Sequence, residues 1–183
     1  MEQFPVNELL MTSGIDRIVY NRGIGGFTTA DMLAHLNEMV LDLEPGQIFI
    51  NIGTNDIAQP DYTLQTLLSQ YTEILRQIRK RLPETEIIIL AYYPVNAELN
   101  RADRPGGAEM FRTRNNENIA AANAALEILA EQEGCRFLNV SQGLTDEKGN
   151  LKAEYTVEGI HMYANGYQVV LENLKPYLQE SAE

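Results

Sequence analysis

The stretch QIFINIGTND (residues 47–56) decides the fold class. Its first six residues, 47–52, form a nearly continuous apolar run, which is typical of a parallel strand covered by helices on both faces. Gly53 permits a sharp turn after this strand, and Asn55 and Asp56 put polar side chains just beyond it. The stretch therefore predicts a buried strand that ends in a polar turn.

Strands and helices alternate on both sides of this stretch. We expect strands at 17–21, 86–93 and 136–140, and helices at 5–14, 28–43, about 63–82, about 115–133 and about 164–179. Helices of this length between strands imply βαβ crossovers, and so predict an α/β fold with a parallel sheet and helices on both faces. Ligands bind beyond the carboxyl ends of the strands in such sheets, so functional residues are expected directly after strands.

Composition and charge exclude several classes of protein. The 183 residues suggest a single domain, 1–183, and the net charge of −12 argues against nucleic acid and anionic membranes as partners. No apolar stretch is long enough to span a bilayer, and the opening MEQFPVNELLM lacks the basic segment of a signal peptide. A single cysteine, Cys135, fits a reducing compartment, so we expect a cytoplasmic protein. The sequence predicts no oligomeric state.

The glycine-rich stretch NRGIGGFTT (21–29) joins a predicted strand to a predicted helix. Thr28 is the expected N-cap of that helix, with Asp31 three residues later as in a capping box. Backbone N–H groups at such a helix start can bind a developing anion. A tight turn that uses its glycines only for packing is the alternative. The pattern matches neither the dinucleotide nor the Walker fingerprint.

The stretch NIGTNDIA (51–58) also lies at a strand end. Asn55 offers a side-chain N–H donor that can be aimed at an oxyanion. The alternative is a structural turn of the Asx type.

The stretch EGIHMYANGY (158–167) places Glu158 three residues before His161. A carboxylate at this spacing can reach the imidazole Nδ1 and so leave Nε2 as a general base. A polar helix start is the alternative. The only other histidine, His35, lies on the predicted 28–43 helix, so the sequence predicts no metal site.

Taken together and in this order, the three stretches resemble the SGNH (GDSL-type) esterases and acylhydrolases along essentially the whole chain. NRGIGGFTT resembles the second block of that family, GTND the third and EGIHMYANGY the fifth. The resemblance implies a flavodoxin-like, three-layer α/β/α fold with a mostly parallel sheet, and a serine hydrolase that acts on a small-molecule ester without a cofactor. It also implies an oxyanion hole from the Gly26 backbone N–H and the Asn55 side chain, with His161 as base. Glu158 stands where the family usually has aspartate.

The family's first block, a strand followed by a Gly-Asp-Ser-like turn with the nucleophile, has no counterpart in this sequence. Ser13, Ser69 and Cys135 fall at unsuitable places, and Ser141 lacks the context of a nucleophile elbow. We therefore expect the first strand and the serine to lie upstream of residue 1, and this polypeptide to be nearly inactive towards esters. The alternative is a non-catalytic SGNH-like protein that binds a small acylated or carbohydrate ligand in the same cleft.

A long polar loop over 94–111 follows the strand at 86–93. Four arginines lie in or just after it: Arg101, Arg104, Arg112 and Arg114. They can meet an anionic group of a substrate, or they can form a solvated charged surface.

Overall fold

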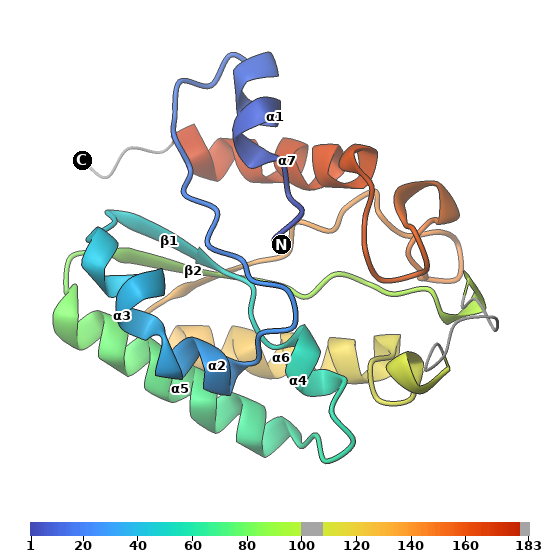
Figure 1. Ribbon diagram of the computed structural model, residues 1–183, viewed down its shortest axis with the longest axis horizontal. Coiled ribbons are helices and arrows are strands. Elements are labelled where there is room, and N and C mark those ends of the chain that lie inside the picture. Colours follow the sequence, from blue (N-terminus) through green and yellow to red (C-terminus); the bar gives the residue numbers. More distant parts are fainter. Residues whose placement is uncertain (100–107, 180–183) are drawn as a thin grey trace. The chain divides into compact units, whose positions relative to one another are not determined.

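A computed structural model of the protein describes residues 1–99 and 108–179 (Figure 1). Its described residues divide into two compact units, which alternate along the chain. The first unit takes its residues from 1–25, 93–108 and 140–183, and the second consists of 26–92 and 109–139. The second unit contains the sheet, and the first contains the opening and closing helices.

The sheet has three parallel strands in the order β1 (Gln47–Ile50), β2 (Glu86–Leu90) and β3 (Arg136–Leu138). Ile88 and Ile89 of the central strand are fully buried, as its continuous apolar sequence predicts. The expected α/β class with a parallel sheet is therefore confirmed. On its other side β1 has no strand partner within the described part of the chain.

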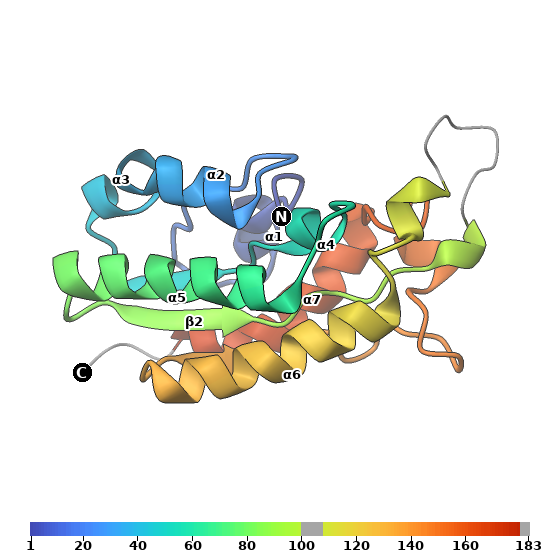
Figure 2. The same cartoon turned by 90° about the horizontal axis from the view of Figure 1, so that it is seen from below.

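The helices of the sheet unit either precede β1 or lie in the crossovers between the strands. They are α2 (Thr29–Ala34), α3 (Leu36–Met39), η1 (Leu41–Leu43), α4 (Thr54–Ile57), α5 (Leu64–Arg81), η3 (Glu109–Phe111) and α6 (Asn116–Gln132). Figure 2 shows α5 and α6 running alongside β2. The face of α5 that carries Leu67, Tyr71, Ile74, Leu75 and Ile78 is buried, which matches its 3.6-residue apolar period.

Side-chain caps set the starts of α5, α6 and α2. Thr63 begins α5 by accepting a hydrogen bond from the backbone N–H of Thr66, and Asn115 begins α6 in the same way. Thr28 begins α2, and Asp31 completes the predicted capping box. These local signals explain why the helix starts follow from the sequence.

The prediction of one continuous helix over 28–43 is wrong. The backbone leaves helical geometry at His35 and again at Val40, so that α2, α3 and η1 are three short pieces. Met39, Val40 and Leu41 are all buried. Three consecutive residues of a straight helix span about 200° of its circumference. The break after Met39 lets all three side chains reach the core.

The first unit is built around two packed helices, α1 (Val6–Thr12) and α7 (Ala164–Gln179), with short turns η2 (Ala97–Leu99) and η4 (Ala153–Tyr155). The Phe4 ring, just before α1, stacks on Tyr167 of α7 with ring centroids 5.0 Å apart. Leu10 of α1 and Val170 and Leu171 of α7 are buried.

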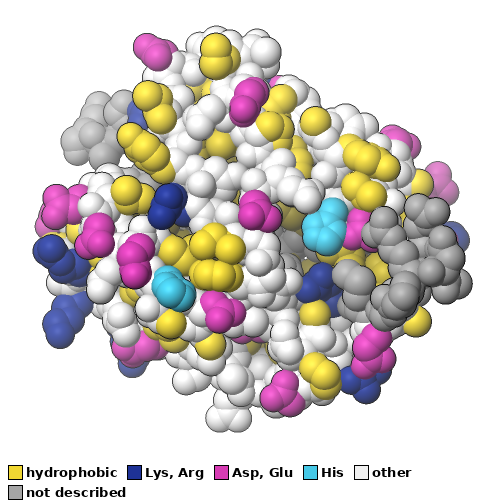
Figure 3. Space-filling view, viewed as in Figure 1, with side chains coloured by type: hydrophobic (Ala, Val, Ile, Leu, Met, Phe, Trp, Pro, Cys, Tyr) yellow, Lys and Arg dark blue, Asp and Glu magenta, His cyan; other side chains and the backbone are white. Residues whose placement is uncertain are grey.

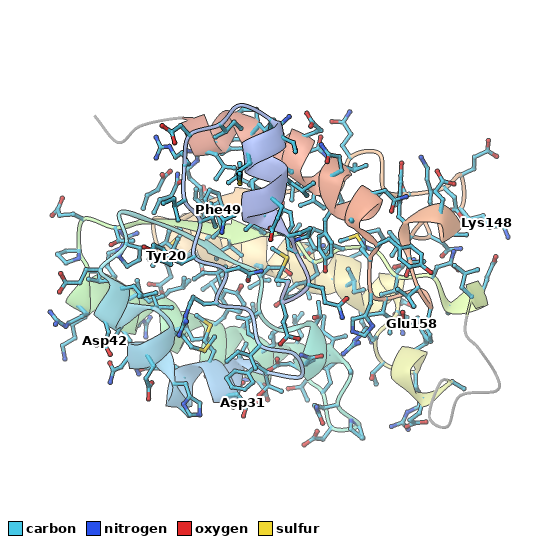
Figure 4. The ribbon with its side chains drawn as sticks, turned by 45° about the horizontal axis from the view of Figure 1, so that its top comes forward. Tyr20, Asp31, Asp42, Phe49, Lys148 and Glu158 are labelled. Atoms are coloured by element: carbon cyan, nitrogen blue, oxygen red, sulfur yellow. The ribbon has the colours of Figure 1, made fainter. Side chains whose placement is uncertain are left out.

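The predicted strand at 17–21 is absent. Ile18 and Tyr20 are 79% and 73% exposed, and the segment that carries Tyr20 is drawn as coil in Figure 4. The N–H and C=O of Val19 bond the side chain of Asn7 instead of a neighbouring strand, both at 2.9 Å. A strand needs a paired neighbour for its backbone groups. The sequence supplies the strand pattern, but no described segment pairs with it.

Candidate active site

Glu158 and His161 lie together on the loop before α7. The Glu158 Oε1 and His161 Nδ1 atoms form a short hydrogen bond, so the structure brings the predicted pair into contact. The glutamate side chain is 9% exposed and the imidazole 53%, and both histidines of the chain reach the surface in Figure 3. A carboxylate that accepts from Nδ1–H leaves Nε2 as the free base of the ring. The glutamate side chain is thus long enough to reach Nδ1 of the imidazole.

The carboxylate of Glu158 is held in a dry environment. Its Oε2 atom is buried and meets no hydrogen-bond donor within the described part of the chain. Buried polar atoms without partners are rare. His161 is therefore the main group that compensates the desolvation of this carboxylate (labelled in Figure 4).

Thr156 closes the loop that carries Glu158 and His161 (residues 156–161, the histidine loop). Its hydroxyl donates to the His161 carbonyl at 2.8 Å and accepts from the Gly159 N–H at 2.9 Å. The Val157 N–H donates to the same His161 carbonyl at 2.8 Å. Because Thr156 is 4% exposed, these bonds are shielded from water, and they fix the backbone that bears the imidazole.

Asn96 braces this loop from the chain that follows β2. Its backbone N–H donates to the Gly159 carbonyl at 2.8 Å, and its side chain donates to the Leu151 carbonyl at 2.8 Å. Asn96 is buried. Asn96 therefore helps to hold the histidine loop in place.

Gly26 and Asn55, the predicted oxyanion-hole residues, both lie in the sheet unit. Gly26 has φ +83°, which requires glycine, and its N–H meets no acceptor among the described residues. The Asn55 side-chain N–H donates to the Phe27 carbonyl at 2.9 Å. The structure therefore brings Asn55 next to the residue that follows Gly26.

A glycine turn after β1 places Asn55. Gly53 has φ +122°, and a Cβ atom added there would lie 2.1 Å from the Tyr92 hydroxyl. That hydroxyl donates to the Ile52 carbonyl at 2.6 Å. Only glycine fits this turn, and the turn starts α4, whose first residues include Asn55.

Asp56 joins the turn after β1 to α2. Its carboxylate accepts from the Thr29 N–H, at 3.0 Å from Oδ2, and contacts the Thr29 hydroxyl. Burial raises the pKa of Asp56, while the hydrogen bonds from Thr29 oppose that rise. Asp56 thus caps α2, the helix after the Gly26 loop, and holds that loop near α4.

The sequence named Arg114 only as one of four arginines in or just after the polar loop, and the structure gives it a distinct place. It is 7% exposed; its Nε donates to the Thr54 carbonyl at 2.9 Å, and a terminal nitrogen donates to Asn55 Oδ1 at 2.8 Å. By contrast Arg112 is exposed and pairs with Glu109 at 2.9 Å. The other two arginines, Arg101 and Arg104, lie outside the described residues. No sequence signal distinguishes Arg114 from its neighbours, because its partners lie about sixty residues away.

The nucleophile candidates that the sequence offered are poorly placed. The Ser13 hydroxyl donates to the Leu9 carbonyl at 2.8 Å, Ser69 lies on the exposed face of α5, and the Ser141 hydroxyl is buried. Burial raises the pKa of the Cys135 thiol, which disfavours the reactive thiolate. None of these four groups is both exposed and activated.

The described residues contain no group of three or more His, Cys, Asp or Glu side chains arranged to hold a metal ion. No helix among them is long and apolar enough to cross a membrane.

Residues 6–169 match the model of the GDSL-like Lipase/Acylhydrolase family, so the chain belongs to this family. The family is one of GDSL-like lipases and acylhydrolases. The resemblance drawn from the three sequence blocks is thereby confirmed.

Solved structures agree with this assignment. A Streptococcus pneumoniae protein provisionally described as a platelet activating factor is 34% identical, with a TM-score of 0.82 over 97% of this chain and 78% of that one. A GDSL-like lipase from Bacteroides thetaiotaomicron is 24% identical, with a TM-score of 0.72 over 94% and 79%. A mutant acetyl-xylooligosaccharide esterase from Geobacillus is 19% identical, with a TM-score of 0.69 over 97% and 80%. The last two show the fold alone.

A curated relative is much longer. The N-acylneuraminate cytidylyltransferase of Escherichia coli is 29% identical over 156 residues, which are 85% of this chain and 33% of that protein. The chain thus spans about a third of the length of this relative.

Proposed function

We propose that this protein is a serine ester hydrolase in which His161 is the general base and Glu158 orients it. The observation that carries the proposal is the pair itself: a buried carboxylate bonded to Nδ1 of a half-exposed imidazole. This arrangement leaves Nε2 to take the proton of a hydroxyl nucleophile and to return it to the leaving group. Water then releases the acyl-enzyme.

Gly26 and Asn55 stabilise the tetrahedral intermediate in this proposal. The Gly26 N–H and one N–H of Asn55 meet no acceptor among the described residues. The other N–H of Asn55 bonds the carbonyl of Phe27, the residue after Gly26, and this bond keeps the two proposed donors near each other. Preorganised donors of this kind act on the charge that develops in the transition state. No cofactor takes part.

The nucleophile, in this proposal, is a serine that lies upstream of Met1 in a longer form of the chain. Contacts through residues 93–96 connect the start of the chain with the histidine loop. The Tyr93 hydroxyl contacts Met1 Sδ at 3.4 Å, and the backbone N–H of Asn96 donates to the Gly159 carbonyl. Asn21 also holds the Met1 carbonyl at 3.0 Å. Without that serine, kcat is expected to fall by roughly 10⁶.

The substrate in this proposal is a small-molecule ester, and the protein acts in the cytoplasm. Acetylated carbohydrates are the first substrates to test. One structural neighbour is an acetyl-xylooligosaccharide esterase, and the curated relative acts on an N-acylneuraminate.

Steady-state hydrolysis of p-nitrophenyl acetate tests the proposal, with a chain extended upstream to include the serine. We expect turnover that His161→Ala lowers by at least about 10⁴-fold. His35→Gln is the matched control, because His35 is also half-exposed but lies between α2 and α3, and it should retain activity. Turnover that survives His161→Ala would refute the role of this base.

The second candidate is a non-catalytic protein that binds a small acylated or carbohydrate ligand in the same cleft. The poor placement of the described serines favours it. It predicts saturable binding of an acetylated sugar by calorimetry with no release of acetate from the extended chain.

A further inference from the structure

We infer that Arg114 positions the side-chain amide of Asn55 for the oxyanion; this rests on the proposed function of Asn55. The two residues lie in the same compact unit, and they approach each other from α4 and from the chain just before α6. No motif assigns a role to this arginine.

The guanidinium group fixes which way the Asn55 amide points. Arginine has only donors, so the Asn55 atom at 2.8 Å from it must be the acceptor Oδ1. The nitrogen Nδ2 then lies on the opposite side and donates to the Phe27 carbonyl at 2.9 Å. A 180° flip of this amide would bring its NH2 group against the guanidinium donor of Arg114 and its oxygen against the Phe27 carbonyl oxygen, and neither contact is a hydrogen bond. Both ends of the amide therefore enforce one orientation.

This orientation leaves one N–H of Asn55 for a ligand. The amide nitrogen carries two hydrogens, and Phe27 accepts one of them. Within the described part of the chain the second hydrogen meets no acceptor. The Phe27 carbonyl that accepts the first hydrogen belongs to the residue after Gly26, the second proposed donor. The arrangement is a donor held ready rather than a saturated structural amide.

The charge on Arg114 also strengthens that donor. A hydrogen bond from a guanidinium to Oδ1 is charge-assisted and polarises the amide, which makes its N–H groups more acidic. Because Arg114 is only 7% exposed, water screens its charge little at the Asn55 amide. Its second bond, from Nε to the Thr54 carbonyl, fixes the guanidinium plane.

The test is a double-mutant cycle in the upstream-extended protein. Arg114→Met is expected to lower kcat about tenfold, part of the 10²–10³ that a whole oxyanion donor supplies, with KM changed less than about twofold. In an Asn55→Ala background the same change is expected to lower kcat less than about twofold, because the amide it positions is gone. Equal losses in both backgrounds would overturn the inference. Arg112→Met is the matched control and should leave kcat unchanged, since Arg112 is exposed.

A second readout does not need turnover. The Asn55 side-chain NH2 signals in a ¹⁵N-correlated NMR spectrum, assigned by their loss in Asn55→Ala, should move towards those of solvated amides in Arg114→Met. Unchanged signals would overturn the inference. If the extended wild type hydrolyses no ester, the proposed function fails, while this spectrum still decides whether Arg114 fixes the amide.

Arg114→Lys covers the case in which Arg114→Met does not fold. Lysine keeps the charge but cannot make both bonds in the plane of a guanidinium. We expect a folded protein with kcat between those of wild type and Asn55→Ala. Wild-type kcat in Arg114→Lys, together with wild-type NH2 signals, would overturn the inference.

Discussion

Thr156→Val tests how firmly the histidine loop is built. The substitution keeps the shape of the side chain and removes the hydroxyl that joins Gly159 to His161. The buried Gly159 N–H then loses its acceptor, which costs about 1–3 kcal/mol, and the lost bond to the His161 carbonyl adds about 0.5–1.5 kcal/mol. The His161 carbonyl keeps a partner in the Val157 N–H, so its loss is the smaller term.

The expected destabilisation is therefore about 1.5–4.5 kcal/mol, which lowers the Tm by roughly 3–18 °C for a chain of this size. Thermal melting followed by circular dichroism measures it, and Thr156→Ser is the control that keeps the hydroxyl. In the upstream-extended protein kcat should also fall, because the imidazole is no longer held. A Tm equal to that of wild type would show that the hydroxyl does not hold this loop, and the reasoning would be refuted.

Two further predictions concern the turn after β1. Gly53→Ala should lower the free energy of unfolding by more than about 3 kcal/mol, because the new Cβ meets the Tyr92 hydroxyl and the backbone φ is positive. Urea unfolding measures this loss. Gly149→Ala is the control for backbone strain alone, because φ is also positive there and a Cβ meets no atom within 4 Å. Asp56 has its pKa raised above the ordinary 3.8 by burial, so the folded state binds its proton more tightly than the unfolded state does. The Asp56 contribution to stability is therefore greatest below about pH 4 and is lost as the pH rises through the higher pKa of the folded state. Urea titrations across this range should show that loss in wild type and not in Asp56→Asn, and identical pH profiles would contradict it.

The elements that the sequence predicted best are those determined locally. β2 and α5 carry their apolar period within a single segment, and Thr28 and Asp31 form their capping box three residues apart. Glu158 and His161 are also three residues apart, and for that reason their contact followed from spacing alone.

The features that the sequence missed depend on distant partners. The alternation of Ile18 and Tyr20 suits a strand, but pairing requires a neighbour, and Asn7 takes that place at Val19. Arg114 resembles an ordinary loop arginine until the fold brings it to Asn55, 59 residues earlier. The local sequence shows neither the contact between Asn7 and Val19 nor the contact between Arg114 and Asn55.

The most direct test of the central claim is mass spectrometry after labelling with a fluorophosphonate, which reacts with activated serines. The account predicts one adduct in the upstream-extended protein, on a serine that precedes Met1, and its loss in His161→Ala. It also predicts no adduct on the 183-residue polypeptide. An adduct on Ser141, or a labelled serine that does not depend on His161, would contradict the account.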